Sequence, residues 1–260
     1  MLTKRLIACF DIVKGRVTKA VQFQDNIDVA PAEELARAMY DAQIDELIFY
    51  DITASIQKRK IDIETVKKVA QCVFIPFTVG GGIKDLNDMY EALKAGAEKI
   101  SVDSMAVRNP AIISEGAKAF GSQCIVLSTQ VKKSGLMPSG YEVFIDGASL
   151  ATGMDAIEWI KRGQELGAGE ICLNSIDNDG TLSGYDLELM KLADTAVSVP
   201  LIASGGAGAP EHLKALFTDT EAQAAIISSM LYSPRMERNY TVSELKEYLV
   251  QNHIGMRSLK

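Results

Sequence analysis

The sequence predicts a (β/α)8 barrel, and two observations carry this prediction. Short apolar runs alternate with amphipathic helical patterns eight times along the 260 residues, and a barrel of this kind typically takes about 250 residues. Glycine-rich turns at residues 79–83 and 203–208 each follow a strand pattern, about half a chain apart, so we expect two similar half-barrels. An open doubly wound sheet is the alternative, but no G-x-G-x-x-G turn follows the first strand pattern.

No linker rich in Pro, Gly or Ser divides the chain, so we expect one domain over residues 1–260. Strands are expected as short apolar runs, because a parallel strand covered by helices is buried on both faces. They lie at residues 5–10, 46–50, 75–79, 99–102, 124–127, 170–173, 199–203 and 224–227.

Helices are expected where apolar residues recur with a helical period, as Leu35 and Met39 do. The patterns cover residues 31–44, 63–71, 86–95, 154–166, 186–193 and 242–251. Pro31, Pro110 and Pro210 stand near helix starts, where a missing N–H costs nothing.

The composition excludes several classes of function. A net charge of −7 argues against general affinity for nucleic acid or anionic membranes. There is no signal-peptide pattern and no apolar stretch approaching about 18 residues, so we expect a cytoplasmic protein. The four cysteines have no CxxC spacing, and neither histidine adjoins a strand end. We therefore expect no metal, no cofactor and no histidine-based catalytic triad.

The glycine turns are candidate phosphate sites, because chemistry in such barrels lies at the carboxyl ends of the strands. Consecutive glycines leave backbone N–H groups open to a phosphate dianion. A substrate with a phosphate at each end would fit two such turns, although the glycines could also serve only to make the turns tight. The two expected cradles comprise Gly81 and Gly82 with Ser104, and Gly205 and Gly206 with Ser228 and Ser229.

Asp11 is the leading acid–base candidate, because it ends the first strand behind an apolar run. Partial burial would raise the pKa of its carboxyl and suit it to proton exchange, although a capping role is the alternative. Lys19 precedes a polar stretch, residues 22–30, which we expect to be a mobile loop over the site. At the matching end of the fifth strand stands Gln130, an amide that forms hydrogen bonds but transfers no proton near neutral pH.

A set of charged residues occupies the opposite ends of the strands. Arg5, Glu46, Lys99 and Glu170 begin the first, second, fourth and sixth expected strands. In a closed barrel these positions surround the amino-terminal face, where two cations and two anions could neutralise one another in a ring of ion pairs. A purely stabilising network is the alternative.

Six stretches together resemble the cyclase subunit of imidazole glycerol phosphate synthase over nearly the whole chain. They lie at residues 51–55, 77–83, 120–124, 167–171, 179–186 and 202–208. The resemblance implies a barrel that receives ammonia from a glutaminase subunit docked at its amino-terminal face. It would use that ammonia to cleave and cyclise a bis-phosphorylated ribulosyl aminoimidazole carboxamide. The products would be imidazole glycerol phosphate, for histidine biosynthesis, and an aminoimidazole carboxamide ribotide.

The resemblance also implies roles for single residues. Asp11 matches one of two acid–base aspartates of the family, and Lys19 matches its loop lysine. The four charged residues of the amino-terminal face match the gate of an ammonia channel. Asp179 and Gly180 join the expected phosphate-binding set.

The sequence departs from the family at the carboxyl-terminal face. Gln130 stands where the family has its second catalytic aspartate, Asp103 replaces an asparagine, and Asn174 replaces a threonine. Tyr232 replaces a histidine or phenylalanine, and residues 26–30 lack the usual loop pattern. Ammonia capture is thus expected to be preserved and the cyclisation chemistry altered.

Three other functions compete with the cyclase. A divergent paralogue could channel ammonia to amidate a sugar in surface-glycan biosynthesis, although such paralogues tend to be altered around the first strand, whereas Asp11 is present here. A non-catalytic scaffold could conduct ammonia to another enzyme. The related sugar isomerase of histidine biosynthesis shares the half-barrel repeat, but it needs no ammonia gate, so the four charged residues speak against it.

Overall fold

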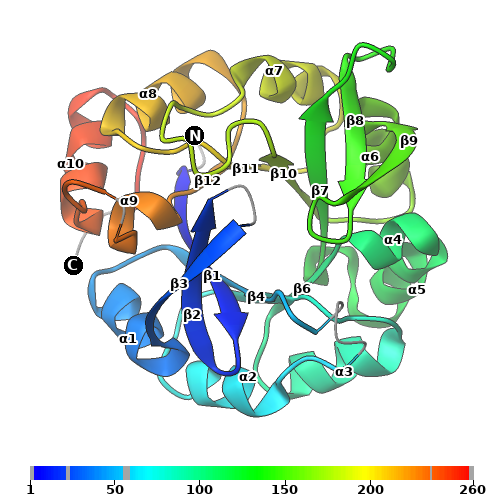
Figure 1. Cartoon of the computed structure of the whole chain (residues 1–260), viewed down its shortest axis with the longest axis horizontal. Coiled ribbons are helices and arrows are strands. Elements are labelled where there is room, and N and C mark those ends of the chain that lie inside the picture. The colour runs from blue at the N-terminus through cyan, green and yellow to red at the C-terminus, as the bar shows by residue number, and fades with distance from the viewer. Residues whose placement is uncertain (1–2, 22–23, 55–58, 235, 258–260) are drawn as a thin grey trace.

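Eight parallel strands close into a barrel in the computed structural model, which describes residues 3–21, 24–54, 59–234 and 236–257 (Figure 1). The ring closes where β12, the last barrel strand in the sequence, pairs in parallel with β1, the first. Around the barrel the strands are β1 (Arg5–Val13), β4 (Glu46–Asp51), β5 (Phe77–Gly80), β6 (Lys99–Val102), β7 (Ile125–Lys133), β10 (Glu170–Ser175), β11 (Leu201–Ser204) and β12 (Ala224–Ile226). The expected (β/α)8 fold and all eight expected strands are confirmed.

Helices surround the barrel in the order that the sequence predicts (Figure 1). They are α1 (Ala32–Asp41), α2 (Ile63–Ala70), α3 (Leu86–Lys94), α4 (Ser104–Arg108), α5 (Ala111–Phe120), α6 (Ala156–Glu165), α7 (Leu187–Ala196), α8 (Pro210–Asp219), α9 (Ser228–Tyr232) and α10 (Val242–Gln251), with a 3-10 turn at Ser122–Cys124. The six expected helices are confirmed; Pro31 and Pro110 directly precede α1 and α5, and α8 begins at Pro210. No helix among the described residues is long and apolar enough to cross a membrane.

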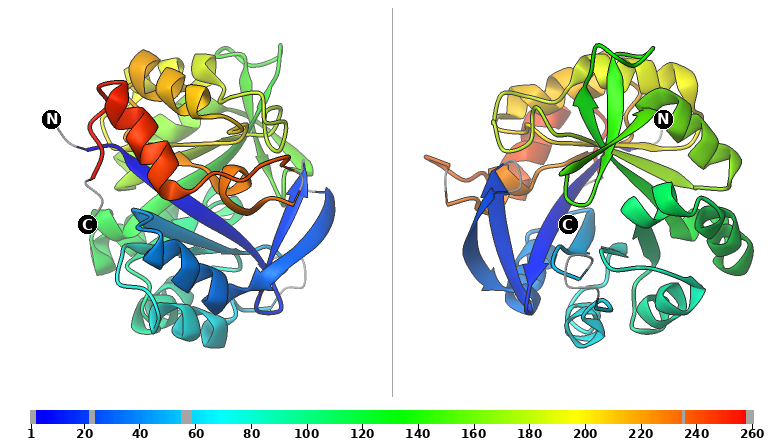
Figure 2. Two further views of the ribbon diagram at one scale, coloured as in Figure 1. Left: turned by 90° about the vertical axis from the view of Figure 1, so that its left-hand side faces the viewer. Right: turned by 45° about the vertical axis from the view of Figure 1, so that its right-hand side comes forward.

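Two antiparallel hairpins were not expected from the sequence. β2 (Arg16–Val21) and β3 (Gln24–Pro31) extend β1, and β8 (Tyr141–Ile145) and β9 (Leu150–Asp155) extend β7. The expectation of a mobile loop at residues 22–30 is therefore wrong for most of that stretch, which forms β3. Residues 22 and 23 of that stretch, and residue 55 of a quoted motif, lie outside the described residues. Figure 2 shows the β2–β3 hairpin on the side of the barrel away from the N-terminus.

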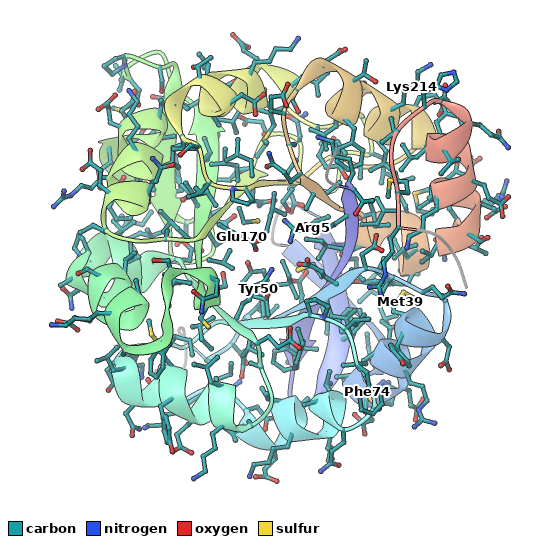
Figure 3. All side chains as sticks on the ribbon, turned by 180° about the vertical axis from the view of Figure 1, so that it is seen from behind. Arg5, Met39, Tyr50, Phe74, Glu170 and Lys214 are labelled. Atoms are coloured by element: carbon teal, nitrogen blue, oxygen red, sulfur yellow. The ribbon has the colours of Figure 1, made fainter. Side chains whose placement is uncertain are left out.

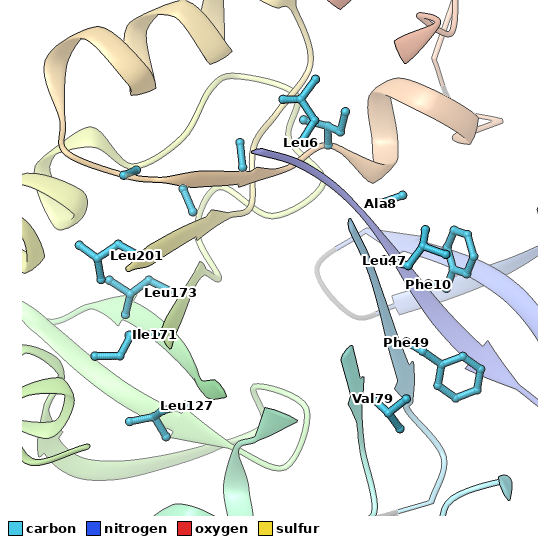
Figure 4. Packing of buried hydrophobic residues seen from close by; sticks show 14 of the residues in the cluster. Leu6, Ala8, Phe10, Leu47, Phe49, Val79, Leu127, Ile171, Leu173 and Leu201 are labelled. Atoms are coloured by element: carbon cyan, nitrogen blue, oxygen red, sulfur yellow. The ribbon is translucent and has the colours of Figure 1, made fainter. Parts of the chain in front are cut away.

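Side chains of each barrel strand alternate between two apolar layers, because successive residues of a strand point to opposite faces. On β1, Leu6, Ala8 and Phe10 belong to the outer layer against the helices (Figure 4). Ile7 belongs to a separate inner cluster, with Cys9 packed against it. The other members of that inner cluster are Ile48, Val126, Cys172, Ile202 and Ala224. The inner cluster therefore gives the barrel interior an apolar lining, to which β5, β6 and β7 add the buried hydroxyls of Thr78, Ser101 and Ser128.

A buried ion pair ties the last helix to the start of the barrel. Lys246 of α10 is 3% exposed, and its Nζ lies 2.7 Å from Oδ1 of Asp45. The other carboxylate oxygen of Asp45 accepts a hydrogen bond from the backbone N–H of Leu6, at 2.9 Å. The first strand and the last helix are thus joined through one carboxylate that precedes β4.

Candidate active site

Asp11 and Lys19 meet at the carboxyl-terminal face because the β1–β2 hairpin folds back on itself. Asp11 pairs with Thr18 across the hairpin, and Nζ of Lys19 lies 4.0 Å from Oδ2 of Asp11. Burial raises the pKa of Asp11 above its usual value, and the positive charge of Lys19 opposes that rise. The expected raised pKa of Asp11 is therefore found, with Lys19 as its ion-pair partner.

Asp179, in the turn after β10, belongs to the same charge cluster. Burial raises the pKa of its carboxyl, Lys19 lowers it and Asp11 raises it further. One lysine therefore serves two carboxyls that repel each other. A phosphate contact at this turn would have to come from backbone N–H groups, because an ionised Asp179 side chain repels a dianion.

A second polar network joins Asp103, Gln130 and Asn174. Nε2 of Gln130 donates to Oδ2 of Asp103 at 3.2 Å, and Nδ2 of Asn174 donates to Oε1 of Gln130 at 2.7 Å. Gln130 of β7 and Asn174 of β10 are direct neighbours in the parallel sheet. Three of the positions at which the sequence departs from the family pattern are thus in contact with one another.

Asp103 is the one carboxyl of this network, and only one of its two oxygens has a hydrogen-bond partner among the described residues. It precedes α4 but forms no capping hydrogen bond with it, and its buried Oδ1 has no partner among the described residues. Burial raises the pKa of Asp103 to about 7, against the opposing hydrogen bond from Gln130. The sequence leaves open whether Asp103 points into the barrel or caps a helix, and the structure shows that its side chain does not cap α4.

The glycine turn after β5 packs against the backbone of Asp51 at the end of β4. Gly81 and Gly82 have φ angles of +84° and +72°, and a Cβ at Gly81 would collide with the backbone carbonyl of Asp51. The carboxylate of Asp51 is buried and receives both guanidinium nitrogens of Arg59, at 2.6 and 2.7 Å. A bidentate pair of this kind fixes geometry as well as charge, so the turn has a firm support.

The turn after β11 has the same backbone character. Gly205 and Gly206 have φ angles of +92° and +100°, and a Cβ at Gly206 would collide with the carbonyl of Gly184. β5 and β11 are third and seventh in strand order, so the two turns face each other across the barrel. The half-barrel repeat remains a prediction, and this match of backbone conformation is in keeping with it.

The serines expected in the two cradles have other partners in the structure. Oγ of Ser104 accepts from the backbone N–H of Asp146 at 2.9 Å. Oγ of Ser228 accepts from the backbone N–H of Cys9 and donates to its carbonyl oxygen, both at 2.8 Å. The hydroxyl of Tyr232 donates to that same carbonyl. Ser229 follows Ser228 in the first turn of α9. Phosphate binding by these residues remains a prediction.

A closed ring of ion pairs lies at the amino-terminal face. Figure 3 shows Arg5 and Glu170 near the barrel axis in the view from behind. Arg5 contacts Glu46 at 2.6 Å and Glu170 at 2.9 Å, and Lys99 contacts the same two carboxylates at 3.3 and 2.9 Å. Burial alone would lower the pKa of Arg5, but the two glutamates outweigh it and raise that pKa. We call these four residues the charge ring.

The apolar inner cluster connects the charge ring to the carboxyl-terminal face. At its upper end the hydroxyl of Tyr50 lies 3.1 Å from Oγ of Ser101, and burial raises the pKa of Tyr50 well above its usual value. Among the described residues no group of three or more His, Cys, Asp or Glu side chains is arranged to hold a metal ion. The charges of the interior are therefore concentrated at its two ends.

These features define a class of protein: a (β/α)8 barrel with partly buried carboxyls of raised pKa at the carboxyl-terminal ends of its strands, where enzymes of this fold have their active sites. Comparison with known proteins is more specific. The family model described as "Histidine biosynthesis protein" matches residues 5–237.

Similar proteins carry the name "Imidazole glycerol phosphate synthase subunit HisF". One from Desulfosudis oleivorans is 51% identical over 260 residues, which cover 99% of each chain. One from Desulfatibacillum aliphaticivorans is 50% identical over 99% of this chain and 98% of its own. One from Solidesulfovibrio magneticus is 48% identical over the full length of both. The chain belongs to the HisF family of imidazole glycerol phosphate synthase subunits, and it is a cyclase of histidine biosynthesis.

Proposed function

We propose that this chain takes ammonia from a glutaminase subunit docked at the amino-terminal face and delivers it to a bis-phosphorylated ribulosyl aminoimidazole carboxamide at the other face. The reaction would yield imidazole glycerol phosphate, an aminoimidazole carboxamide ribotide and one water, because the ketone oxygen of the ribulosyl group leaves when the ammonia nitrogen bonds to that carbon. The observation that carries the proposal is the alignment of three features along one axis. The charge ring, the apolar inner cluster and the Asp11 site follow one another from face to face.

The apolar interior suits neutral ammonia rather than ammonium. Burying an unpaired cation among side chains such as Ile7, Ile48 and Val126 costs far more than burying a small neutral molecule. The charge ring surrounds the entrance to this interior, where its side chains are between 7% and 21% exposed. It would separate the path from bulk water until the partner subunit docks.

The two glycine turns suit a substrate with a phosphate at each end. Gly81 and Gly82 lie after β5, and Gly205 and Gly206 lie on the opposite side of the barrel after β11. A ligand held at both ends would extend across the carboxyl-terminal face, with its middle near Asp11 and the upper end of the interior. Gly180, in the turn after β10, borders the second phosphate site.

The cysteines are in keeping with a cytoplasmic location. Cys9, Cys72, Cys124 and Cys172 are all free thiols, as is usual in a reducing compartment. A cytoplasmic enzyme of this kind would have direct access to phosphorylated metabolites.

Steady-state turnover tests the proposal directly. The isolated chain is expected to convert the bis-phosphorylated substrate in the presence of ammonium salts at alkaline pH, where free ammonia is available. Glutamine is expected to replace ammonium only when a glutaminase subunit is added. Complementation of a histidine auxotroph lacking its own cyclase subunit provides the cellular counterpart. No turnover with either nitrogen source would contradict the proposal and favour an ammonia-conducting paralogue that amidates a sugar.

A further inference from the structure

Asp103, at the carboxyl-terminal face, carries a carboxyl with a buried oxygen and has no role in the reaction described above. Asp103 follows β6, three strands from Asp11 of β1 in the order of the barrel. Its Oδ2 accepts from Gln130, and its Oδ1 is buried without a partner among the described residues. Buried carboxylate oxygens are almost always hydrogen-bonded, so an unpaired one calls for an explanation, and a catalytic role is one.

The proposed reaction requires two groups that handle protons. When ammonia-derived nitrogen bonds to carbon it loses a proton, and the nitrogen that departs keeps the electron pair of its broken C–N bond and gains one. A general base and a general acid on either side of the substrate meet this need. Asp11 can serve as one of them. Gln130 cannot be the other, because a neutral amide neither gives up nor takes up a proton near neutral pH.

We propose that Asp103 is the second acid–base group of this enzyme, held in place by the amide of Gln130, which in turn is held by Asn174. This inference rests on the proposed function. Nε2 of Gln130 fixes one oxygen of the Asp103 carboxyl at 3.2 Å and leaves the other free. Asn174 fixes the orientation of Gln130, because its donated hydrogen bond of 2.7 Å requires the amide oxygen on that side. Gln130 and Asn174 are positioning residues in this arrangement.

The charges around Asp103 keep its proton available. Burial raises the pKa of Asp103 to about 7, the Gln130 hydrogen bond lowers it, Asp146 beyond β8 raises it and Arg108 of α4 lowers it. Arg108 is held away by its own ion pair with Asp146. Burial, and after it the charge of Asp103, raises the pKa of the Cys172 thiol on β10 to about 12. A carboxyl with this pKa is present in both forms near neutral pH, as general acid–base catalysis requires.

In the proposed step Asp103 and Asp11 exchange one proton each with the substrate. One carboxylic acid gives its proton to the departing nitrogen as the C–N bond breaks, and the other carboxylate takes a proton from the ammonia-derived nitrogen as the new C–N bond forms. The proton balance of the pair is zero, and no atom is oxidised or reduced. The same two groups return to their starting forms by passing one proton to solvent and taking one from it.

The test is an exchange of the carboxyl and the amide within the network. Asp103→Asn keeps an oxygen that can accept from Gln130 but removes the acid, and we expect ammonium-driven kcat to fall by about 10²- to 10⁴-fold. The double variant Asp103→Asn/Gln130→Asp returns a carboxyl to the pair and is expected to recover most of that loss. kcat is measured from pH 6 to 9 with total ammonium adjusted to keep free ammonia constant. The wild-type kcat should change with pH near pH 7, where Asp103 titrates, and this change should be absent from Asp103→Asn.

Asp146→Asn is the matched control. It removes a neighbouring carboxylate outside the network and leaves the backbone N–H to Ser104 in place, so kcat should be retained. The change of kcat near pH 7 should move to lower pH, because the charge of Asp146 raises the pKa of Asp103. Full activity of Asp103→Asn, or a loss that the double variant does not recover, would overturn the inference while wild-type turnover still upheld the proposed function. A wild type without turnover would refute the proposed function, and the inference with it.

Discussion

At the amino-terminal face each member of the charge ring meets two partners of opposite sign, whereas at the carboxyl-terminal face Asp11, Asp103 and Asp179, all partly buried, outnumber their cations. Arg5 and Lys99 alternate with Glu46 and Glu170 in a closed cycle. At the other face Lys19 serves both Asp11 and Asp179, and Asp103 is bound by an amide. Matched charges fix a structure and resist titration, while unmatched buried carboxyls hold protons that can be transferred. The barrel thus carries matched charges at one end and partly buried carboxyls of raised pKa at the other.

Asp11→Asn tests the chemical end and is expected to have the largest effect. The amide retains the shape of the side chain but cannot exchange a proton, so kcat with ammonium should fall by about 10²- to 10⁴-fold. KM for the bis-phosphorylated substrate should stay within a few-fold, because the glycine turns are untouched. A rise in KM with unchanged kcat would mean that Asp11 binds substrate and does not transfer protons.

Glu46→Gln removes one of the two carboxylates of the charge ring at the amino-terminal face. It leaves Arg5 and Lys99 to share Glu170, so the free energy of unfolding should drop by about 2–3 kcal/mol. Glutamine-driven turnover with the partner subunit should fall by about tenfold, or 1.4 kcal/mol, while ammonium-driven turnover is retained. Urea denaturation and the two assays measure these effects.

Glu158→Gln provides the control for the charge ring, because the Glu158–Lys161 pair lies in the open on α6. Its removal should change the free energy of unfolding by no more than about 0.5 kcal/mol. Equal losses in Glu46→Gln and Glu158→Gln would show that the charge ring is an ordinary surface network.

Asp103→Asn also tests the difference between the two faces, through the pH dependence of the free energy of unfolding rather than through kcat. The unfolded chain loses the Asp103 proton near pH 3.9, whereas the folded chain keeps it to about pH 7. The folded state therefore binds the extra proton between these values, and wild-type stability falls as pH rises through that window. We expect Asp103→Asn to exceed wild type by about 1–3 kcal/mol at pH 8 and to match it below pH 4. Urea midpoints at both pH values measure the difference, and a gain independent of pH would contradict it.

Lys19→Met is expected to have the smallest effect. The charge of Lys19 lowers the pKa of Asp11 and of Asp179, so its removal should move the acidic limb of the kcat profile to higher pH. Turnover at pH 8 should change little, and turnover at pH 6 should fall several-fold. A uniform loss at all pH values would indicate that Lys19 contacts the substrate directly.

Most of the barrel was predictable from the sequence because its signals are local. Apolar runs mark the strands, and the charge ring was found because its four members all begin strands. The β2–β3 hairpin was missed because β3 is polar enough to resemble a loop. Lys14 and Gly15, both at positive φ, form the turn that precedes β2.

The network around Asp103 could not be predicted in the same way. Its three members are separated by 27 and 44 positions along the chain, and only strand register brings them together. A sequence comparison shows three independent departures, whereas the structure shows one connected change. The choice between a capping and a free Asp103 side chain likewise depends on its backbone angles, which no local pattern reveals.

The link between Lys246 and Asp45 bears on the order in which the barrel forms. It spans 201 positions of the chain, and such distant contacts form late in folding because a long loop must close first. During synthesis the first strands would emerge long before α10, and the Asp45 carboxylate would stay exposed to water until Lys246 is made. We expect the barrel to lock only after the ribosome has released the last helix, so that the amino-terminal face becomes ready for a partner in the finished chain alone.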